Sequence, residues 1–201
     1  MNQQRVARLV TDAVVRSPAL WRLLRGRTRA MFDELAPTWE TRIGPHHVAA
    51  LSLALAELMP PARALDVGTG TGVAAQTVAR RFTGAQVVGV DLAPAMAAQA
   101  KALLPAELAS RVRFEVADAS ELPFDDGAFE LVTLANMIPF FDELARVTAP
   151  AGAIVFSFSR GAETPIHVPA ERLRRELRRR GFTLFADFSA GPSTALLARR
   201  R

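Results

Sequence analysis

Short uninterrupted apolar runs alternate along the middle of the chain with stretches in which apolar residues recur every three or four positions. The first pattern predicts strands buried on both faces, and the second predicts helices. The predicted strands cover residues 64–67, 85–91, 112–119, a segment ending at 136, and 153–159; the predicted helices cover 73–82 and 168–180. Such alternation is typical of an α/β domain whose mostly parallel sheet carries helices on both faces.

The spacing of apolar residues in the N-terminal part of the chain predicts helices before the first strand. Residues 3–24 have the spacing of an amphipathic helix, interrupted where Pro18 suits the first turn of a second helix. A further helix begins near residue 46 and ends before Pro60, because the residue before a proline is disfavoured in the helical region. The chain therefore starts with helices alone.

The C-terminal end predicts a β-hairpin. Residues 182–188 and 194–197 are strand-like runs separated by a turn that contains Gly191. We expect a division into an N-terminal helical cap, residues 1–60, and a core domain, residues 61–201.

Composition limits the class of protein. With 201 residues, half of them apolar, the chain is long enough for one domain and a modest extension. It contains no cysteine, which excludes disulfides and thiolate ligands. Arginines interrupt the apolar segments near the start, so we expect neither a secretory signal nor a transmembrane helix, and the cytoplasm is the expected location.

The net charge of +5 is unevenly distributed. Residues 1–30 contain seven arginines and a single acid, Asp12, whereas residues 31–170 contain nine basic and sixteen acidic residues. The acidic middle argues against a nucleic-acid enzyme, which lines its cleft with positive charge. The basic amphipathic segment at residues 1–30 has two interpretations: a solvated face on a helix packed against the domain, or weak contact with an anionic membrane surface.

The first predicted strand ends in a glycine-rich turn that leads into the helix over 73–82. Glycine lets the backbone adopt positive φ and lets a ligand lie against the main chain, while the helix N-terminus favours anionic groups. The dinucleotide fingerprint G-x-G-x-x-G would need its third glycine at Val73. The spacing of Gly68, Gly70 and Gly72 therefore makes a dinucleotide the second choice.

Two further predicted strands end in acids. Asp91 follows Gly72 by nineteen residues, the separation expected for a carboxylate that accepts both hydroxyls of an adenosine ribose. Asp118, followed by Ala119, closes the next strand, and Asn136 closes the one after. Because parallel strands end at the same edge of a sheet, we expect these residues and the glycine turn to share one crevice.

These elements together resemble the class I S-adenosylmethionine-dependent methyltransferases, and among them the small-molecule (type 11) domain similar to the ubiquinone- and menaquinone-biosynthesis enzymes. The turn from Asp66 to Gly72 resembles motif I, and Asp118-Ala119 resembles the element that reads the adenine. Leu122-Pro-Phe and Glu143-Leu-Ala-Arg-Val resemble the passages before the fourth and fifth strands, although Ala151 replaces a glycine. The resemblance implies a Rossmann-like, doubly wound, seven-stranded sheet that is mostly parallel and ends in an antiparallel hairpin.

The resemblance also implies a set of residues that bind S-adenosylmethionine. They are Trp39, Asp66, Gly68, Thr69, Gly70, Gly72, Asp91, Leu92, Met96, Asp118, Ala119 and Asn136. Trp39, which follows a Phe-Asp-x-x-Ala stretch like that of the family, would cover the methionine end of the cofactor or else anchor the cap. Leu92 and Met96 would lie against the adenine or belong to the core. Asp118 would accept from the adenine amine or cap the residues after it.

The reaction implied is transfer of a methyl group to a small-molecule acceptor by in-line displacement. If the acceptor atom is a hydroxyl oxygen, His46 or His47 is the candidate general base, because neutral imidazole accepts a proton near physiological pH. The histidines lack the spacing of metal ligands, so we expect no metal site. Two alternatives remain open: a protein that binds S-adenosylmethionine without turnover, and a nicotinamide-dependent oxidoreductase.

Overall fold

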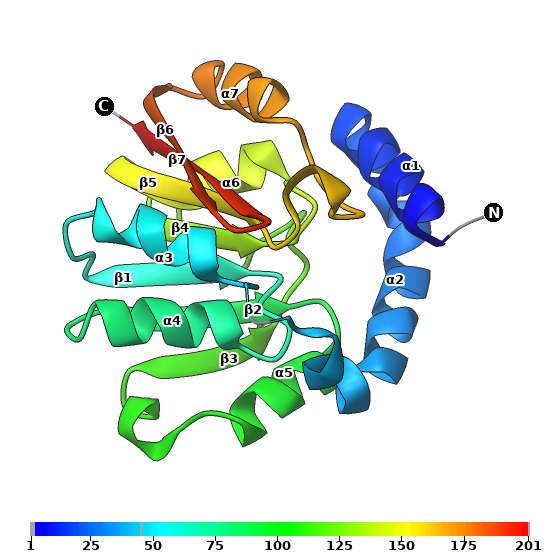
Figure 1. Cartoon of the computed structure of the whole chain (residues 1–201), viewed down its shortest axis with the longest axis horizontal. Coiled ribbons are helices and arrows are strands. Elements are labelled where there is room, and N and C mark those ends of the chain that lie inside the picture. The colour runs from blue at the N-terminus through cyan, green and yellow to red at the C-terminus, as the bar shows by residue number, and fades with distance from the viewer. Residues whose placement is uncertain (1–2, 45, 201) are drawn as a thin grey trace.

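One seven-stranded sheet forms the centre of the protein in the computed structural model, which describes residues 3–44 and 46–200 (Figure 1). The strands are β1 (Arg63–Val67), β2 (Gln86–Asp91), β3 (Val112–Val116), β4 (Phe129–Ala135), β5 (Thr148–Phe158), β6 (Phe182–Ala190) and β7 (Ser193–Arg200). They lie in the order β3-β2-β1-β4-β5-β7-β6. The pairs from β3 to β5 are parallel, and β7 runs antiparallel to both β5 and β6. The predicted α/β class with its C-terminal hairpin is confirmed.

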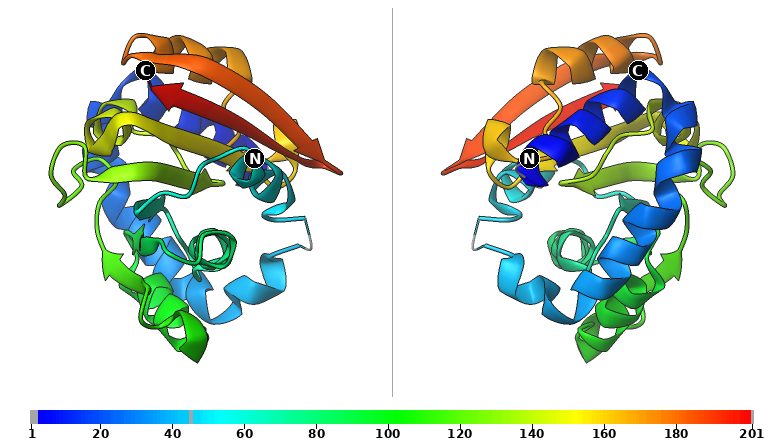
Figure 2. Two further views of the ribbon diagram at one scale, coloured as in Figure 1. Left: turned by 90° about the vertical axis from the view of Figure 1, so that its left-hand side faces the viewer. Right: turned by 90° about the vertical axis from the view of Figure 1, so that its right-hand side faces the viewer.

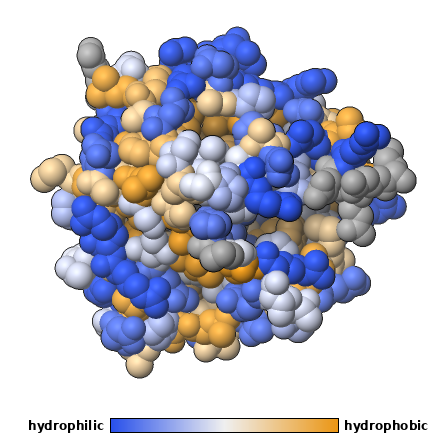
Figure 3. Space-filling view, viewed as in Figure 1, coloured by the Kyte–Doolittle hydropathy of each residue, from blue (hydrophilic) through white to orange (hydrophobic). Residues whose placement is uncertain are grey.

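Helices cover both faces of the sheet. They are α1 (Gln3–Arg16), α2 (Trp21–Leu35), α3 (Ala49–Ala56), α4 (Val73–Arg81), α5 (Pro94–Ala102), α6 (Phe141–Val147) and α7 (Ala170–Arg178), with shorter 3-10 turns η1 (Pro18–Leu20), η2 (Ala36–Arg42), η3 (Ala106–Leu108) and η4 (Gly161–Glu163). Side chains of α3 and α4 form one buried cluster with the sheet, and those of α6 and α7 form another. The surface over α7 is hydrophilic (Figure 3), as its run of arginines predicts.

The predicted N-terminal cap divides into two parts. α1, η1, α2 and η2 lie along the side of the molecule where the parallel strands end (Figures 1 and 2), and Val14 and Trp21 are buried there. In contrast, α3 packs on the sheet next to β6 and β7, with Leu51 and Leu55 fully buried. The helix at residues 49–56 thus belongs to the layer that covers the sheet, while the domain boundary at residue 60 stays a prediction. Within the described residues, no helix is both long and apolar enough to span a bilayer.

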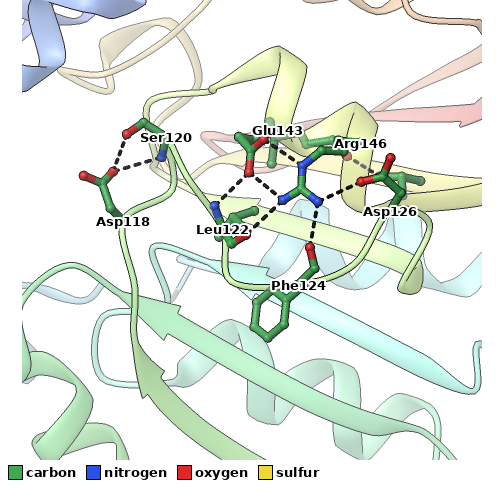
Figure 4. Close-up of polar contacts among 9 residues, drawn as sticks. Asp118, Ser120, Leu122, Phe124, Asp126, Glu143 and Arg146 are labelled. Atoms are coloured by element: carbon green, nitrogen blue, oxygen red, sulfur yellow. Dashed lines mark hydrogen bonds and ion pairs between the residues drawn. The ribbon is translucent and has the colours of Figure 1, made fainter.

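Arg146 of α6 holds the loop that leads into β4 (Figure 4). Its guanidinium donates to the carbonyl oxygens of Leu122 and Phe124, at 2.9 and 2.6 Å, and forms ion pairs with Glu143 and Asp126. Glu143 also accepts from the Leu122 N–H at 2.7 Å, and its hydrogen bonds with Arg146 lower the pKa of its carboxyl. The passages Leu122-Pro-Phe and Glu143-Leu-Ala-Arg-Val, which resemble the family, are therefore bound to each other through Arg146. This role depends on the planar guanidinium of arginine, which donates to several acceptors at once.

Two non-glycine residues in the described ranges have positive φ. Ala151, in the first part of β5, has φ of 60°, and Asn136, after β4, has φ of 53°. Asparagine tolerates this region, whereas alanine adopts it at a cost of about 1 kcal/mol. Ala151 therefore adopts the left-handed conformation at the position where the family that this sequence resembles has a glycine.

Candidate active site

The glycine turn is held against the end of β2. Gly68, Gly70 and Gly72 have φ values of 70, 55 and 88°, which suit glycine because it has no Cβ. The N–H groups of Gly68 and Thr69 both donate to a carbonyl near the end of β2, at 2.9 Å. The turn thus presents bare main chain immediately before α4.

Asp66 supports this turn from beneath. Its carboxylate is buried and accepts from the hydroxyls of Thr69 and Thr133, each at 2.7 Å. Burial raises the pKa of Asp66 to about 6, although the threonine hydrogen bonds oppose the shift. The side chain that the resemblance assigned to the cofactor therefore contacts the turn and β4, and would act on a ligand through the turn.

The raised pKa of Asp66 predicts a pH dependence of stability. Because the folded chain favours the protonated carboxyl, the contribution of Asp66 to the free energy of unfolding falls as the pH rises from 3.8 to about 6 and is level above that range. The total change is roughly 3 kcal/mol. The variant Asp66→Asn should lack it, since an amide does not titrate. Urea unfolding of both proteins across this pH range measures the difference, and identical pH slopes would contradict the expectation.

Asp91 lies at the end of β2 with each carboxylate oxygen bound to a main-chain N–H. Its Oδ2 accepts from Gly70 and its Oδ1 from Ala93, both at 2.9 Å. Burial raises the pKa of Asp91, and these two hydrogen bonds oppose that effect. An ionised carboxylate has about four acceptor positions, so each oxygen retains capacity for a hydroxyl. The position and chemistry suit the ribose diol that the sequence predicted.

Asp118 follows β3 and is engaged by the N-terminal helix. Its Oδ1 accepts from Trp21 Nε1 at 2.8 Å and from the N–H and hydroxyl of Ser120 (Figure 4), while Arg25 pairs with Oδ2 at 3.3 Å. Burial alone would raise the pKa of Asp118, but the hydrogen bonds outweigh it and the pKa is lowered. Asp118 thus makes the hydrogen bonds to Ser120 that a capping residue would make, although the residues directly after it form a turn and not a helix. Oδ2 is the less occupied oxygen and the one available to an adenine amine.

An aromatic ring and a thioether lie over the glycine turn. Trp39 in η2 places its Nε1 3.3 Å from where a Cβ on Gly70 would stand, and its ring meets Phe32 edge-on. Met137, directly after Asn136, places its Sδ 2.6 Å from the Cβ position of Gly68. Trp39 also belongs to a small cluster with η2 and α5, so it both contacts the turn and anchors the N-terminal segment.

The apolar residues expected near the adenine differ in exposure. Met96 is fully buried against Ala36 and Ala93 and therefore belongs to the core in this structure. Ala119 is also buried, whereas Leu92 is half-buried at the end of β2. Of these predicted contacts, Leu92 has the side chain most accessible to a ligand.

Asn136 joins His47 and Ser159 at the ends of β4 and β5. Its Oδ1 accepts from the Ser159 N–H at 2.9 Å, which fixes the orientation of the amide. The Nδ2 group then faces the Ser159 hydroxyl at 3.0 Å and His47 Nδ1 at 3.4 Å. Burial lowers the pKa of His47 more than the charge of Glu40 raises it, so the ring is neutral at physiological pH.

The two candidate histidines have different surroundings. His47 is half-buried beside Asn136, whereas His46 is exposed and lies near Gly191 in the turn between β6 and β7. The structure therefore places His47 beside Asn136 after β4, whereas His46 lies farther along the same edge, at the turn between β6 and β7.

Several contacts at the site were not expected from the sequence. Asp33 accepts from the N–H of Ala95 at 2.9 Å and so caps the start of α5. It belongs to the Phe-Asp-x-x-Ala stretch, which gave a signal for it. Trp21 and Arg25 lie on the basic helix, where nothing in the local pattern indicated a role at Asp118.

The charges around the turn fit the cofactor that the resemblance implies. Asp91 binds the turn and Asp66 lies beneath it, the charge of Asp33 acts on Asp91, and Asp118 follows the neighbouring strand β3. S-adenosylmethionine carries a sulfonium and an ammonium, and an acidic site stabilises both. Main chain for the cofactor to lie on and a carboxylate for its ribose are both present, so the residues fit this group.

Sequence comparison identifies the domain. A profile described as a methyltransferase domain matches residues 64–152. Demethylmenaquinone methyltransferase of Thermus thermophilus is 45% identical over 140 residues, which cover 62% of this chain and 62% of that protein. Tocopherol O-methyltransferase of Arabidopsis thaliana is 39% identical over 101 residues, which cover 46% of this chain and 29% of that protein. The chain thus spans less than two thirds of the length of these relatives.

Structural comparison extends the likeness to nearly the whole fold. The cyclase SpnF has a TM-score of 0.69 and 22% sequence identity over 86% of this chain and 94% of that one. Since that protein is named as a cyclase, the shared fold does not decide the reaction. The sequence match, which runs from β1 into β5, is more specific. The chain therefore contains a class I, S-adenosylmethionine-dependent methyltransferase domain, matched over residues 64–152.

Proposed function

We propose that this protein transfers the methyl group of S-adenosylmethionine to a small-molecule acceptor. The observation that carries the proposal is the meeting of three elements at the ends of adjacent strands: the glycine turn after β1, Asp91 after β2, and the Asn136–His47 pair after β4. Ligands of open α/β sheets bind at this edge. The location we propose is the cytoplasm, as the sequence predicted.

The protein's part in such a reaction is to position two molecules and to exclude water. The bound cofactor supplies an electrophilic methyl group on sulfur. Asp91 would hold the ribose hydroxyls, and the main chain from Gly68 to Gly72 would lie beneath the cofactor with Trp39 close to it. Fixing the reacting groups in line is worth several kcal/mol, roughly 7–11 in well-oriented systems, so a separate chemical catalyst is not obligatory.

His47 is the residue we propose as general base for a hydroxyl acceptor. Because the fixed amide of Asn136 offers only a donor, Nδ1 of His47 is the unprotonated nitrogen of the neutral ring. Its long contact of 3.4 Å with Asn136 leaves Nδ1 weakly engaged. A substrate hydroxyl in place of the amide would donate its proton to Nδ1, and the Asn136 amide would keep its hydrogen bond to the Ser159 hydroxyl.

The class of acceptor we propose is a small aromatic or apolar molecule. Support comes from the relatives, one named for demethylmenaquinone and the other for tocopherol. Ile138 and Phe140, which follow Asn136 closely in the sequence, are buried apolar residues, so the segment after β4 is largely apolar. Such surroundings favour a ring over a strongly charged substrate.

A transfer assay tests the proposal. Purified protein is incubated with isotope-labelled S-adenosylmethionine and a panel of phenols, hydroquinones and amines, and labelled products are identified by mass spectrometry. We expect at least one aromatic acceptor to gain the labelled methyl group. Tight binding of S-adenosylhomocysteine without any product would favour the binding protein without turnover. Binding of a nicotinamide cofactor in its place would favour the oxidoreductase.

A further inference from the structure

The N-terminal helices present apolar side chains to solvent. The side chain of Leu23 on α2 is 79% exposed and that of Leu9 on α1 is 60% exposed, and Leu20 and Met31 are also exposed. The opposite sides of the same helices bury Val14 and Trp21 against the body of the protein. These exposed residues therefore lie on outward faces that the chain itself leaves uncovered.

Arginines lie on the same outward faces. On α1, Leu9 is four residues from Arg5 and seven from Arg16, so these side chains share one stripe of the helix. On α2, Arg27 is four residues from Leu23, and Arg22 is adjacent to it. Within the part of the chain that the structure describes, Arg16, Arg22 and Arg27 form no ion pair. Of the acids on these two helices, Asp12 and Asp33 pair with Arg172 and Arg29, and the third, Glu34, is exposed near the end of α2. The outward faces are thus both apolar and cationic.

The two helices lie on one side of the molecule. Both are in front in the right-hand panel of Figure 2, which looks at the side where the parallel strands end. The candidate active site is at the same edge, because Trp21 and Arg25 of α2 contact Asp118. A surface bound to these faces would therefore lie close to the active site.

We propose that the outward faces of α1, η1 and α2 dock on an anionic lipid surface. The inference rests on the proposed function in one respect: docking would bring the candidate active site close to apolar acceptors. Arginines next to protruding leucines match a bilayer interface, where guanidinium groups meet lipid phosphates and leucines enter the boundary with the acyl chains. A nucleic acid would be favoured by the arginines alone and would gain nothing from exposed leucines. Charge complementarity and apolar exposure together favour lipid.

Vesicle flotation with the full chain tests the proposal. We expect the protein to float with vesicles of phosphatidylcholine and phosphatidylglycerol, to remain behind with phosphatidylcholine alone, and to be released by high salt. The double variant Leu9→Ser/Leu23→Ser should lower the apparent affinity at least about tenfold. The variant Arg22→Gln/Arg27→Gln should lower it by a similar factor of about ten or more.

Matched variants elsewhere on the surface serve as controls. Met59→Ser changes a side chain that is 86% exposed before β1, and Lys101→Gln removes an exposed cation at the end of α5; both should float like the parent. Failure of the parent protein to float, equal binding to neutral vesicles, or an equal loss in the controls would overturn the proposal. Binding to an acidic polypeptide but not to vesicles would overturn it in favour of a protein partner.

Titration with S-adenosylhomocysteine keeps this inference separate from the proposed function. Variants of the outward faces should bind it like the parent, because Leu9, Leu23, Arg22 and Arg27 do not contact the glycine turn or its aspartates. A protein that floats but methylates nothing in the transfer assay would refute the function and leave the docking surface standing. A protein that methylates soluble acceptors but does not bind vesicles would refute the docking surface and support the proposed function.

Discussion

Replacing Asp91 with alanine should weaken the binding of S-adenosylhomocysteine by at least about a hundredfold. The carboxylate is expected to accept both ribose hydroxyls, and charge-assisted hydrogen bonds contribute roughly 1.5–3 kcal/mol each. It also holds the N–H groups of Gly70 and Ala93, so its loss loosens the turn on which the cofactor would lie. Isothermal titration of the parent and variant proteins measures the change directly.

The matched control for this substitution is Asp125→Ala. Asp125 is an exposed aspartate before β4 and lies outside the site, so its replacement should leave the affinity unchanged. Asp91→Asn, which keeps one acceptor oxygen without the charge, should fall between the parent and Asp91→Ala. Circular dichroism of each variant shows whether the fold is retained. Equal affinities for parent and Asp91→Ala would remove Asp91 from the site.

Replacing His47 with alanine should lower kcat for a hydroxyl acceptor by roughly a hundredfold or more, the usual contribution of a general base. Because burial lowers the pKa of His47, the ring stays neutral down to a pH below its ordinary value of 6.5. The rate of the parent enzyme should therefore be level at neutral pH and fall only as the pH drops through that lowered pKa. The variant should lose this acidic limb of the pH profile.

The neighbouring histidine supplies the control. His46→Ala changes the same type of side chain one position earlier, but at an exposed place next to Gly191, so its kcat and pH profile should match the parent. If both variants retain full activity with an unchanged acidic limb, neither histidine is the base. If both lose activity equally, the effect comes from the segment that carries them and not from proton transfer at Nδ1.

Much of the fold could be predicted because its signals are local. The apolar runs, the glycine turn and the Gly191 turn each lie within a few residues, and each corresponds to an observed strand, loop or hairpin. Strand boundaries were less accurate: β5 begins at Thr148, before the predicted residue 153, because the segment around Ala151 pairs irregularly with β4. Hydrophobic periodicity does not detect such an irregularity.

The sequence predicted which strand ends form the candidate site, but it did not predict which side chains contact one another there. Asp118 was expected to face a ligand, yet one of its partners, Trp21, is 97 positions away in the sequence, a pairing that spacing cannot reveal. Asp66 was expected at the ligand, yet threonine hydroxyls from the turn and β4 surround it. Which of two adjacent histidines faces the site likewise depends on the path of the chain before α3.

The engagement of Asp118 by α2 has a thermodynamic consequence. One side of this helix binds Asp118, which we propose as a residue of the nucleoside pocket, through Trp21 and Arg25, and the other side carries Leu23 and Arg27. If a shift of α2 alters the affinity of either side for its ligand, reciprocity requires that occupancy of the other changes by the same factor. Cofactor loading and surface attachment would then be linked equilibria, coupled through a single helix.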